Sequence, residues 1–442
     1  MDSNSDNKFK GISRRNFCKT TSMAAGGAFL STLPIGASAY VAPNETLNIA
    51  VIGCGGRGTG AVNNVLSTGD GVKLVAMADA FEDRLEDSYS DLMGRYEGTG
   101  KIEVPDDHKF VGFEAYKHAI ELADVVLLCA PPGFRPRHFE EAVRQGKHIF
   151  AEKPIATDIP GLRRFLDAVE SSKEKELNVV VGLQRHYETK YREVSKRIHD
   201  GAIGDVISGQ VYWNSAGVWV RERQPDQTEM EYQMRNWYYF NWLSGDHILE
   251  QHIHNIDVAN WFIGEYPTSA QGMGGRQVRT GKEYGEIFDH HFVEFTYPGG
   301  AIISSQCRHQ ENTMQRVTEN LQGTRGTVET GPGRIRHYNG YLVYDHDDEG
   351  DPNPYQQEID ELIAAIRNGK VINDGDNAAN SNLSAIMGRM ATYSGQVIDR
   401  EEAINSGLSL MPERLAWDAE PPVMPDEDGY YPVPTPGQTR VL

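Results

Sequence analysis

The chain is 442 residues long, which exceeds the size of one ordinary hydrophobic core and predicts two or three domains. Its 43 basic and 63 acidic residues give a formal net charge of −20 at pH 7, which argues against a nucleic-acid-binding or anionic-membrane-binding surface. Beyond the N-terminal segment there is no apolar run of about 18 residues, so no membrane span is expected.

The N-terminal segment predicts export. An arginine pair, Arg14-Arg15, precedes a weakly hydrophobic run of small residues, and Ala37-Ser38-Ala39 has the small-residue pattern of a cleavage site. This order favours a twin-arginine signal peptide over residues 1–39 rather than a disordered basic tail. We therefore expect the twin-arginine export machinery as a partner and a periplasmic or otherwise exported location.

Short strands and helices alternate between residues 45 and 182, a pattern typical of an α/β fold with a doubly wound parallel sheet. The expected strands are β-branched or continuous apolar runs: 47–53, 72–77, 124–130, 148–151 and 178–182. The expected helices separate them: 58–66, 82–95, 114–122, 137–145 and 159–173. Residues 101–109 are expected to form an inserted loop. We assign residues 45–182 to a Rossmann domain.

After a helix near residues 189–200 the strands become longer, which predicts an α+β domain with a large open, mainly antiparallel sheet over residues 183–350. The expected strands are 206–213, a hairpin of 288–295 and 301–307 across the turn Tyr297-Pro-Gly-Gly300, and further strands near 326–345. Amphipathic helices at 355–368 and 383–398 predict a helical segment, residues 351–400, that packs back on the body. Residues 401–442 are rich in proline and acidic residues and are expected to form an extended tail.

A glycine-rich loop follows the first strand and opens the first helix. It reads Gly53-Cys54-Gly55-Gly56-Arg57-Gly58, a G-x-G-x-x-G pattern that permits a tight turn, close approach of the backbone to a pyrophosphate and close helix–strand packing. Asp79 ends the next strand, where a carboxylate accepts hydrogen bonds from ribose hydroxyls and repels a 2′-phosphate. The pattern therefore favours NAD over NADP, with Arg84 as the competing indication for NADP.

Two further strand ends carry candidate residues. Ala130 and Pro131 stand at the end of the strand at 124–130 and are expected to line the cofactor cleft, although the prolines there are also compatible with a simple turn. Glu152-Lys153-Pro154 follows the strand at 148–151. A lysine before proline is held extended, so its ammonium can point into the cleft, whereas the alternative is a surface lysine at a turn.

Residues 244–257 concentrate histidines and carboxylates. If this segment is helical, Glu250, His254 and Asp257 lie on one face. The adjoining face is apolar and would anchor the segment: Leu249, Ile253 and Ile256. Such an arrangement places chemistry on a rigid element.

The glycine loop, the Glu-Lys-Pro motif and this late segment together resemble the Gfo/Idh/MocA family of nicotinamide-dependent oxidoreductases, over roughly residues 45–400. The resemblance implies that Lys153 orients the substrate and polarises its hydroxyl, that His254 is the acid/base, and that Asp257 orients the substrate or the histidine. It implies cofactor contacts from Glu152 and Gln184. It also implies a homo-oligomer, and substrate contacts from the residues after the sixth strand: Arg185, His186 and Tyr187.

The segment departs from the usual family pattern at two positions. Glu250 stands where aspartate is usual and His252 where glycine is usual, so we expect both to shape the substrate pocket. Glu250, His252 and His254 are also compatible with metal ligation, but a helix would place the two histidines on different faces, so no metal is expected. Buried structural histidines are the plainer alternative for His247 and His252. Trp237 is a candidate sugar-stacking contact, although core packing explains most such aromatics.

These features predict an exported NAD-dependent oxidoreductase acting on a sugar, cyclitol or glycoside hydroxyl. His254 would accept the hydroxyl proton and Lys153 would stabilise the developing charge on oxygen, with the histidine titrating near neutrality. Because there is no free NAD pool outside the cytoplasm, the cofactor would be held tightly. One alternative is a redox-neutral NAD-dependent glycosidase that works by oxidation, elimination, hydration and re-reduction. A second is a non-catalytic periplasmic sugar-binding module.

Overall fold

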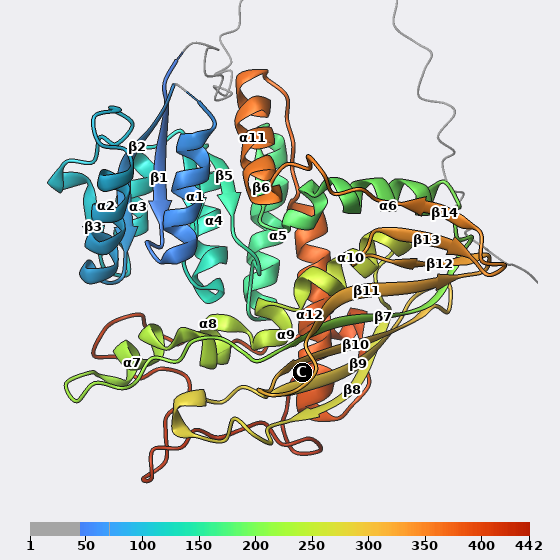
Figure 1. The fold of residues 1–442 in the computed structure, drawn as a ribbon. Helices are drawn as coiled ribbons and strands as arrows, with labels where there is room; N and C mark the ends of the chain where they lie inside the picture. The colour runs from blue at the N-terminus through green and yellow to red at the C-terminus, as the bar shows by residue number, and fades with distance from the viewer. Residues whose placement is uncertain (1–44, 70) are drawn as a thin grey trace, which may run out of the picture. The chain divides into compact units, whose positions relative to one another are not determined.

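The computed structural model describes residues 45–69 and 71–442, and these residues form two β-sheets with helices packed against them (Figure 1). The predicted twin-arginine signal peptide lies outside the described residues. Within the described ranges no helix is long and apolar enough to cross a membrane.

The first sheet is parallel, with the strand order β3-β2-β1-β4-β5-β6, which confirms the predicted doubly wound α/β class. Its strands are β1 (Leu47–Ile52), β2 (Val72–Asp79), β3 (Lys109–Val111), β4 (Val125–Leu128), β5 (His148–Ala151) and β6 (Val179–Val181). Its helices are α1 (Gly56–Ser67), α2 (Glu82–Arg95), α3 (Ala115–Glu121), α4 (Arg135–Arg144) and α5 (Ile159–Glu174). The strand order reverses between β1 and β4, and ligands of such sheets bind at the carboxyl ends of the strands there. The short strand β3 begins inside the predicted loop, where three residues give no readable periodicity.

The second sheet has the order β14-β13-β12-β11-β7-β10-β9-β8-β15 and is antiparallel except where β7 and β10 run parallel. The predicted open, mainly antiparallel sheet and the β9–β10 hairpin are therefore confirmed. Its strands are β7 (Val206–Ser215), β8 (Ser269–Gly275), β9 (His290–Thr296), β10 (Ile302–His309), β11 (Arg316–Gly323), β12 (Gly326–Glu329), β13 (Arg334–His337), β14 (Leu342–Asp345) and β15 (Ile398–Asp399). Strand β8 was not predicted, because its sequence contains three glycines and no β-branched residue.

The residues after the parallel sheet supply the remaining helices. They are α6 (Thr189–His199), α7 (Glu229–Arg235), α8 (Asn241–Ser244), α9 (His247–Glu250), α10 (Ile253–Ile263), α11 (Pro354–Arg367), α12 (Gly375–Ser394) and α13 (Arg400–Ile404). Helix α11 packs against α1, while α12 packs on β8 and β9 on one side and on α5 on the other (Figure 1). These helices join the two sheets into one body.

The segment 244–257 forms short helices instead of the single helix that its pattern predicted. Helix α8 ends at Ser244, because the next residue, Gly245, has a φ of +77°, and a second break at Gln251 and His252 separates α9 from α10. Glu250 and His254 consequently lie on different helices. The apolar residues do anchor the segment, since the following side chains are buried: Leu249, Ile253 and Ile256.

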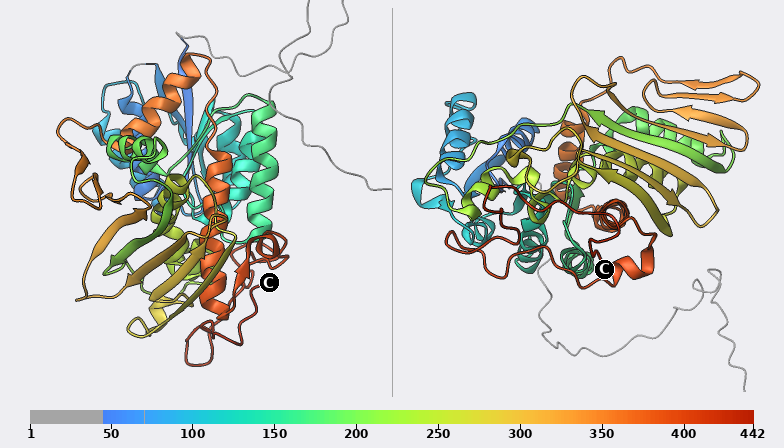
Figure 2. Two further views of the ribbon diagram at one scale, coloured as in Figure 1. Left: turned by 90° about the vertical axis from the view of Figure 1, so that its right-hand side faces the viewer. Right: turned by 90° about the horizontal axis from the view of Figure 1, so that it is seen from below.

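Residues 405–442 form no helix or strand, yet they are packed against the body. They run beside α7 and α8, where the backbone oxygen of Val423 accepts a hydrogen bond from Gln233 and Tyr431 donates one to Glu229 (Figure 2). Apolar side chains of this tail join the aromatic cluster around Trp242: Leu410, Met411, Leu415 and Trp417. The tail is therefore part of the wall of the protein near the carboxyl ends of the parallel strands.

Candidate active site

Two adjoining cavities lie at the carboxyl ends of the parallel strands. The first, of ≈ 360 Å³, contains the glycine loop and Asp79. The second, of ≈ 300 Å³, is lined by residues from both halves of the chain, among them Lys153, Glu250 and His254. The two cavities share these lining residues: Arg57, Cys129, Ala130, Pro131 and Trp237. One elongated ligand can therefore extend from the first cavity into the second.

The glycine loop has the geometry of a pyrophosphate cradle. A Cβ atom on Gly53, whose φ is +95°, would lie 2.4 Å from the Ala130 nitrogen, and one on Gly58 would lie 1.9 Å from the Gly53 oxygen. Only glycine fits at these two positions. Gly55 and Gly56 instead have no atom within 4 Å of an added Cβ, so the space that side chains would fill is left for a ligand beside the N-terminus of α1.

The Asp79 side chain links the end of β2 to this loop through hydrogen bonds. Its Oδ2 atom accepts a hydrogen bond from the backbone N–H of Cys54 at 2.7 Å, and its Oδ1 atom accepts one from the N–H of Phe81 at 2.9 Å. Burial raises the pKa of the Asp79 carboxyl above its usual value, although the two bonds favour its charged form. Arg84 lines the same cavity and forms no ion pair with any other described residue.

Arg57 stands at the junction of the two cavities. Its guanidinium pairs with Glu152 and, at 3.0 Å, with Glu358 of α11, and it lies over the ring of Tyr355. Burial, together with the nearby charge of Glu152, raises the pKa of the Glu358 carboxyl well above its usual value. The C-terminal helix α11 thus holds a residue of the glycine loop in place.

Lys153 points into the second cavity. Its ammonium donates to the backbone oxygen of Glu250 at 2.5 Å and to the Glu250 carboxylate at 3.0 Å. Both side chains are about 15% exposed, and both line the cavity. The ammonium is therefore held at the edge of the space that a substrate would fill.

His254 lies in the same cavity, and its ring packs against Trp213 with the ring centroids 5.9 Å apart. Its Nδ1 atom has no hydrogen-bond partner among the described residues. Burial first, and then the positive charge of Lys153, lowers the pKa of His254 well below its usual value. The expectation that this histidine titrates near neutrality is therefore wrong for the ligand-free site, where the imidazole is a neutral base over the whole neutral range.

Comparison with known proteins identifies the fold and the class. Residues 47–182 match the sequence model described as "Oxidoreductase family, NAD-binding Rossmann fold", and residues 191–329 match "GFO/IDH/MocA C-terminal domain". The chain belongs to the GFO/IDH/MocA family. It is an NAD(P)-dependent oxidoreductase, and the glycine cradle and the adjoining cavity fit that cofactor.

Two curated relatives and one solved structure are similar to this GFO/IDH/MocA protein. An inositol 2-dehydrogenase of Rhizobium meliloti is 29% identical over 75% of this chain and 93% of the relative. A 2,7-anhydro-N-acetylneuraminate hydratase of Escherichia coli is 24% identical over 57% of this chain and 65% of the relative. Among solved structures, an aldose-aldose oxidoreductase of Caulobacter crescentus complexed with glycerol matches with a TM-score of 0.62 at 20% identity, covering 80% of this chain and all of that one.

Asp257, the third candidate catalytic residue of this GFO/IDH/MocA protein, does not line either cavity. Its carboxylate pairs with His186 at 2.8 Å and accepts hydrogen bonds from Asn377 at 3.0 Å and Ser381 at 2.7 Å. Burial opposes a charge on His186, but the charge of Asp257 and the bond to it raise the pKa of His186. Asp257 thus links α10 to α12 in the present arrangement.

The remaining residues that were predicted to contact the cofactor or the substrate are distributed unevenly. Trp237 lines both cavities and Gln184 lines the second. Arg185 forms an ion pair with Glu319, Tyr187 donates to Asp374 at 2.7 Å, and His252 bonds Ser305 at 2.7 Å. Within the described ranges these three side chains line neither cavity, so any effect they have on the pocket acts through the residues that line it.

Several lining residues of the second cavity were not predicted from the sequence, among them Gln251 and Tyr355. Gln251 lies between Glu250 and the predicted histidines, but a neutral amide in a polar segment carries no distinguishing pattern. Tyr355 comes from α11, about two hundred residues beyond Lys153 in the chain, and only the return of that helix to α1 brings it to the site. No sequence feature marks that return.

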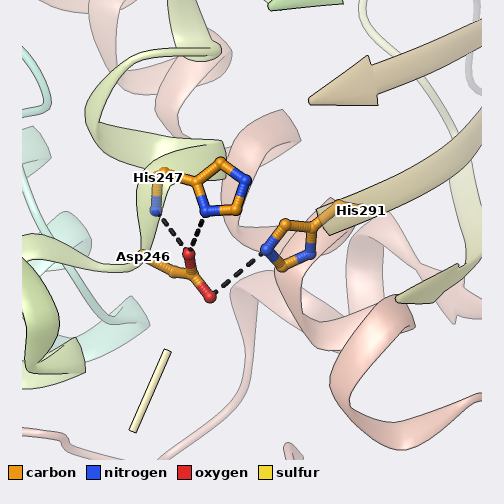
Figure 3. Close-up of side chains that lie close together, drawn as sticks. All are labelled: Asp246, His247 and His291. Atoms are coloured by element: carbon orange, nitrogen blue, oxygen red, sulfur yellow. Dashed lines mark hydrogen bonds and ion pairs between the residues drawn. The ribbon is translucent and has the colours of Figure 1, made fainter. Parts of the chain in front are cut away.

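A buried polar cluster lies next to the catalytic segment, formed by Asp246, His247 and His291 (Figure 3). The two imidazoles point at different oxygens of one carboxylate, with His247 Nδ1 at 2.7 Å and His291 Nε2 at 3.2 Å. The same carboxylate also accepts from the backbone of Phe288 at 3.0 Å and from Tyr393 at 2.5 Å. Donors therefore surround both oxygens, and we describe the cluster as a hydrogen-bonded hub that fixes the start of α9.

Proposed function

We propose that this protein oxidises a ring hydroxyl of a cyclitol or sugar, using NAD in preference to NADP. The observation that carries the proposal is the meeting of Lys153 and His254, from distant parts of the chain, in one cavity that adjoins the glycine cradle. The relative named as an inositol 2-dehydrogenase supports a polyhydroxylated ring as the substrate class.

In this proposal the side chains of the second cavity have separate roles in the oxidation. His254, neutral because burial lowers its pKa, accepts the proton of the reacting hydroxyl. The ammonium of Lys153 lies where it stabilises negative charge on that oxygen, and Glu250 holds it there through two hydrogen bonds. The nicotinamide supplies the hydride acceptor when it is bound. Removing the proton and stabilising the oxygen in one step avoids a free alkoxide.

The preference for NAD rests on Asp79. A carboxylate at the end of β2 accepts hydrogen bonds from ribose hydroxyls and repels a 2′-phosphate. Arg84, which lacks an ion pair among the described residues and lines the same cavity, favours NADP instead. Measuring the Kd of NAD⁺ and of NADP⁺ by calorimetry separates the two, and tighter binding of NADP⁺ would refute the preference.

Tight retention of the cofactor is supported by the segment from 216 to 240, which we call the cover segment. Its residues Trp219, Arg221 and Trp237 line the first cavity together with the glycine loop. Arg235 of α7 pairs with Asp83 of α2 at 2.9 Å, which fastens the cover segment to the parallel-sheet domain. A dinucleotide in this cavity would be enclosed from both sides, which slows its release.

An exported enzyme without a free NAD pool must return the hydride within its own cycle, and we propose this for the present protein. Its location outside the cytoplasm rests on the twin-arginine pattern alone, and assembly as a homo-oligomer rests on the family resemblance. The redox-neutral glycosidase remains the second candidate. The relative named as a hydratase favours it, because adding water involves no net oxidation. The non-catalytic sugar-binding module has less support, because both Lys153 and His254 line the cavity.

Absorbance at 340 nm tests the proposal. Mature protein, purified without added cofactor, is mixed with myo-inositol, scyllo-inositol or D-glucose. A rise at 340 nm that stops after one equivalent indicates a retained cofactor and oxidation of the ring, whereas no rise with or without added NAD⁺ would refute it. An aryl glycoside gives the second arm, since release of the aglycone without added NAD⁺ would establish the redox-neutral cleavage instead.

A further inference from the structure

Gln251 presents an amide donor to the second cavity. It follows α9 directly, at the break between α9 and α10, and lines the cavity beside Glu250. Its Oε1 atom lies 2.8 Å from Nε2 of His309. Its amide nitrogen has no hydrogen-bond partner among the described residues, and it is not closed off from the cavity. The nitrogen is therefore available to a ligand.

The orientation of this amide is set by His309 at the end of β10. Burial first, and then the neighbouring His247, lowers the pKa of His309 well below its usual value, so the ring is neutral and carries one N–H. The Gln251 oxygen can only accept, so the hydrogen lies on Nε2 of His309. The amide nitrogen is consequently turned away from His309, and the side chain that carries it lines the cavity.

His309 is itself held by the buried hub. Its ring stacks on His247 with the centroids 4.3 Å apart and on Tyr238 at 5.7 Å. His247 in turn donates to Asp246, whose carboxylate is surrounded by donors (Figure 3). The backbone of Asp246 has φ of +72°, a conformation that a non-glycine residue adopts only where its surroundings enforce it. A rigid chain of contacts thus runs from the hub to the pocket wall.

Glu250 and Gln251 place a carboxylate acceptor and an amide donor side by side in the cavity. A sugar hydroxyl both donates and accepts, so neighbouring hydroxyls on one ring match such a pair. The rings of Trp213 and Trp237 line the same cavity and offer apolar surface to the faces of a ring. The lining therefore suits a ring with two adjacent hydroxyls better than an open-chain or singly hydroxylated substrate.

We propose that Gln251 is a specificity-determining residue, which donates a hydrogen bond to the ring hydroxyl next to the one that is oxidised, and that His309 is its positioning residue. This inference rests on the proposed function, because it names the second hydroxyl of the same substrate. It predicts that a ring lacking that hydroxyl binds less well. A buried donor left without a partner reduces affinity by about 10-fold.

Calorimetric titration of the protein loaded with NADH tests this without any turnover. The ligands are myo-inositol, scyllo-inositol and D-glucose, followed by the monodeoxy analogues of whichever binds most tightly. Wild type is expected to bind one monodeoxy analogue about 10-fold more weakly than the parent ring. Gln251→Met is expected to bind the parent and that analogue equally. Gln438→Met, at an exposed position in the tail, is the matched control and is expected to behave as wild type.

His309→Phe keeps an aromatic ring to stack on His247 but removes the N–H that orients the amide. It is expected to lose discrimination against the same analogue while the melting temperature stays near that of wild type, whereas a purely structural role would lower the melting temperature and spare the discrimination. Undiminished discrimination by Gln251→Met, or no binding of any ring polyol, would overturn the inference. Failure of the proposed function is a separate result, because it is the absence of NADH formation by wild type.

Discussion

Replacing Lys153 by Met removes a charge from the second cavity with little change in shape. The ammonium now donates to the backbone oxygen and the carboxylate of Glu250, and its charge lowers the pKa of His254. A single donor aimed at a developing oxyanion contributes about 3 kcal/mol, so kcat/KM for oxidation should fall by about 10²-fold to 10³-fold. The dinucleotide should still bind, because the glycine cradle is untouched.

The pH profile provides the sharper readout for the same substitution. His254 acts as a base only above its pKa, so the falling limb of kcat/KM in wild type lies well below pH 6.5. Without Lys153 the pKa of His254 rises, and the falling limb should move to higher pH. The assay is the single-turnover rate of NADH formation at 340 nm, measured against substrate concentration from pH 4.5 to 8, with the exposed Lys370→Met as control. Wild-type activity, or loss of activity with the limb unmoved, would refute the assignment of Lys153 and His254 to one site.

Three further outcomes follow from the same geometry. Gly58→Ala should lower the melting temperature and abolish NAD binding, because the new Cβ would lie 1.9 Å from a backbone oxygen. Gly55→Ala should fold normally and weaken NAD binding alone, because its Cβ would meet no protein atom. Equal melting temperatures of the two variants would contradict the assigned geometry of the glycine loop. His254→Gln should reduce kcat by about 10²-fold to 10⁴-fold and leave the Kd for NAD⁺ unchanged, and a variant that retains its rate would exclude His254 as the base. Trp417→Ala should speed cofactor loss during gel filtration, because the Trp417 ring centroid lies 5.1 Å from that of Phe81, which lines the first cavity. Retention of the cofactor as in wild type would show that the tail does not close the cleft.

The parallel-sheet half was predictable because its determinants are local. The glycines of the loop, the β-branched strands and Asp79 each act through neighbours a few residues away, and a short apolar run favours a buried strand in such an alternation. The sequence likewise placed Lys153 at a strand end and His254 in a polar segment. Both line the second cavity in the structure.

The interior of the site was harder to predict, because it depends on contacts between distant residues. The break at Gln251 and His252 separates Glu250 from His254, and His252 there bonds Ser305 of β10, a partner that no local pattern predicts. Strand β8 forms despite its glycines, because β9 and α12 offer it partners on two sides.

The sequence by itself determined the class of this protein: a nicotinamide cradle, an ammonium, an imidazole, and a segment of histidines and carboxylates that departs from its relatives. The tertiary structure decided what each of those side chains does. Lys153 faces the cavity with Glu250, while Asp257 faces α12 and His252 faces Ser305, although all four stand in recognisable motifs. The physical reason is burial, because a histidine or a carboxylate acquires its charge, its partners and its pKa from the residues that the fold packs around it.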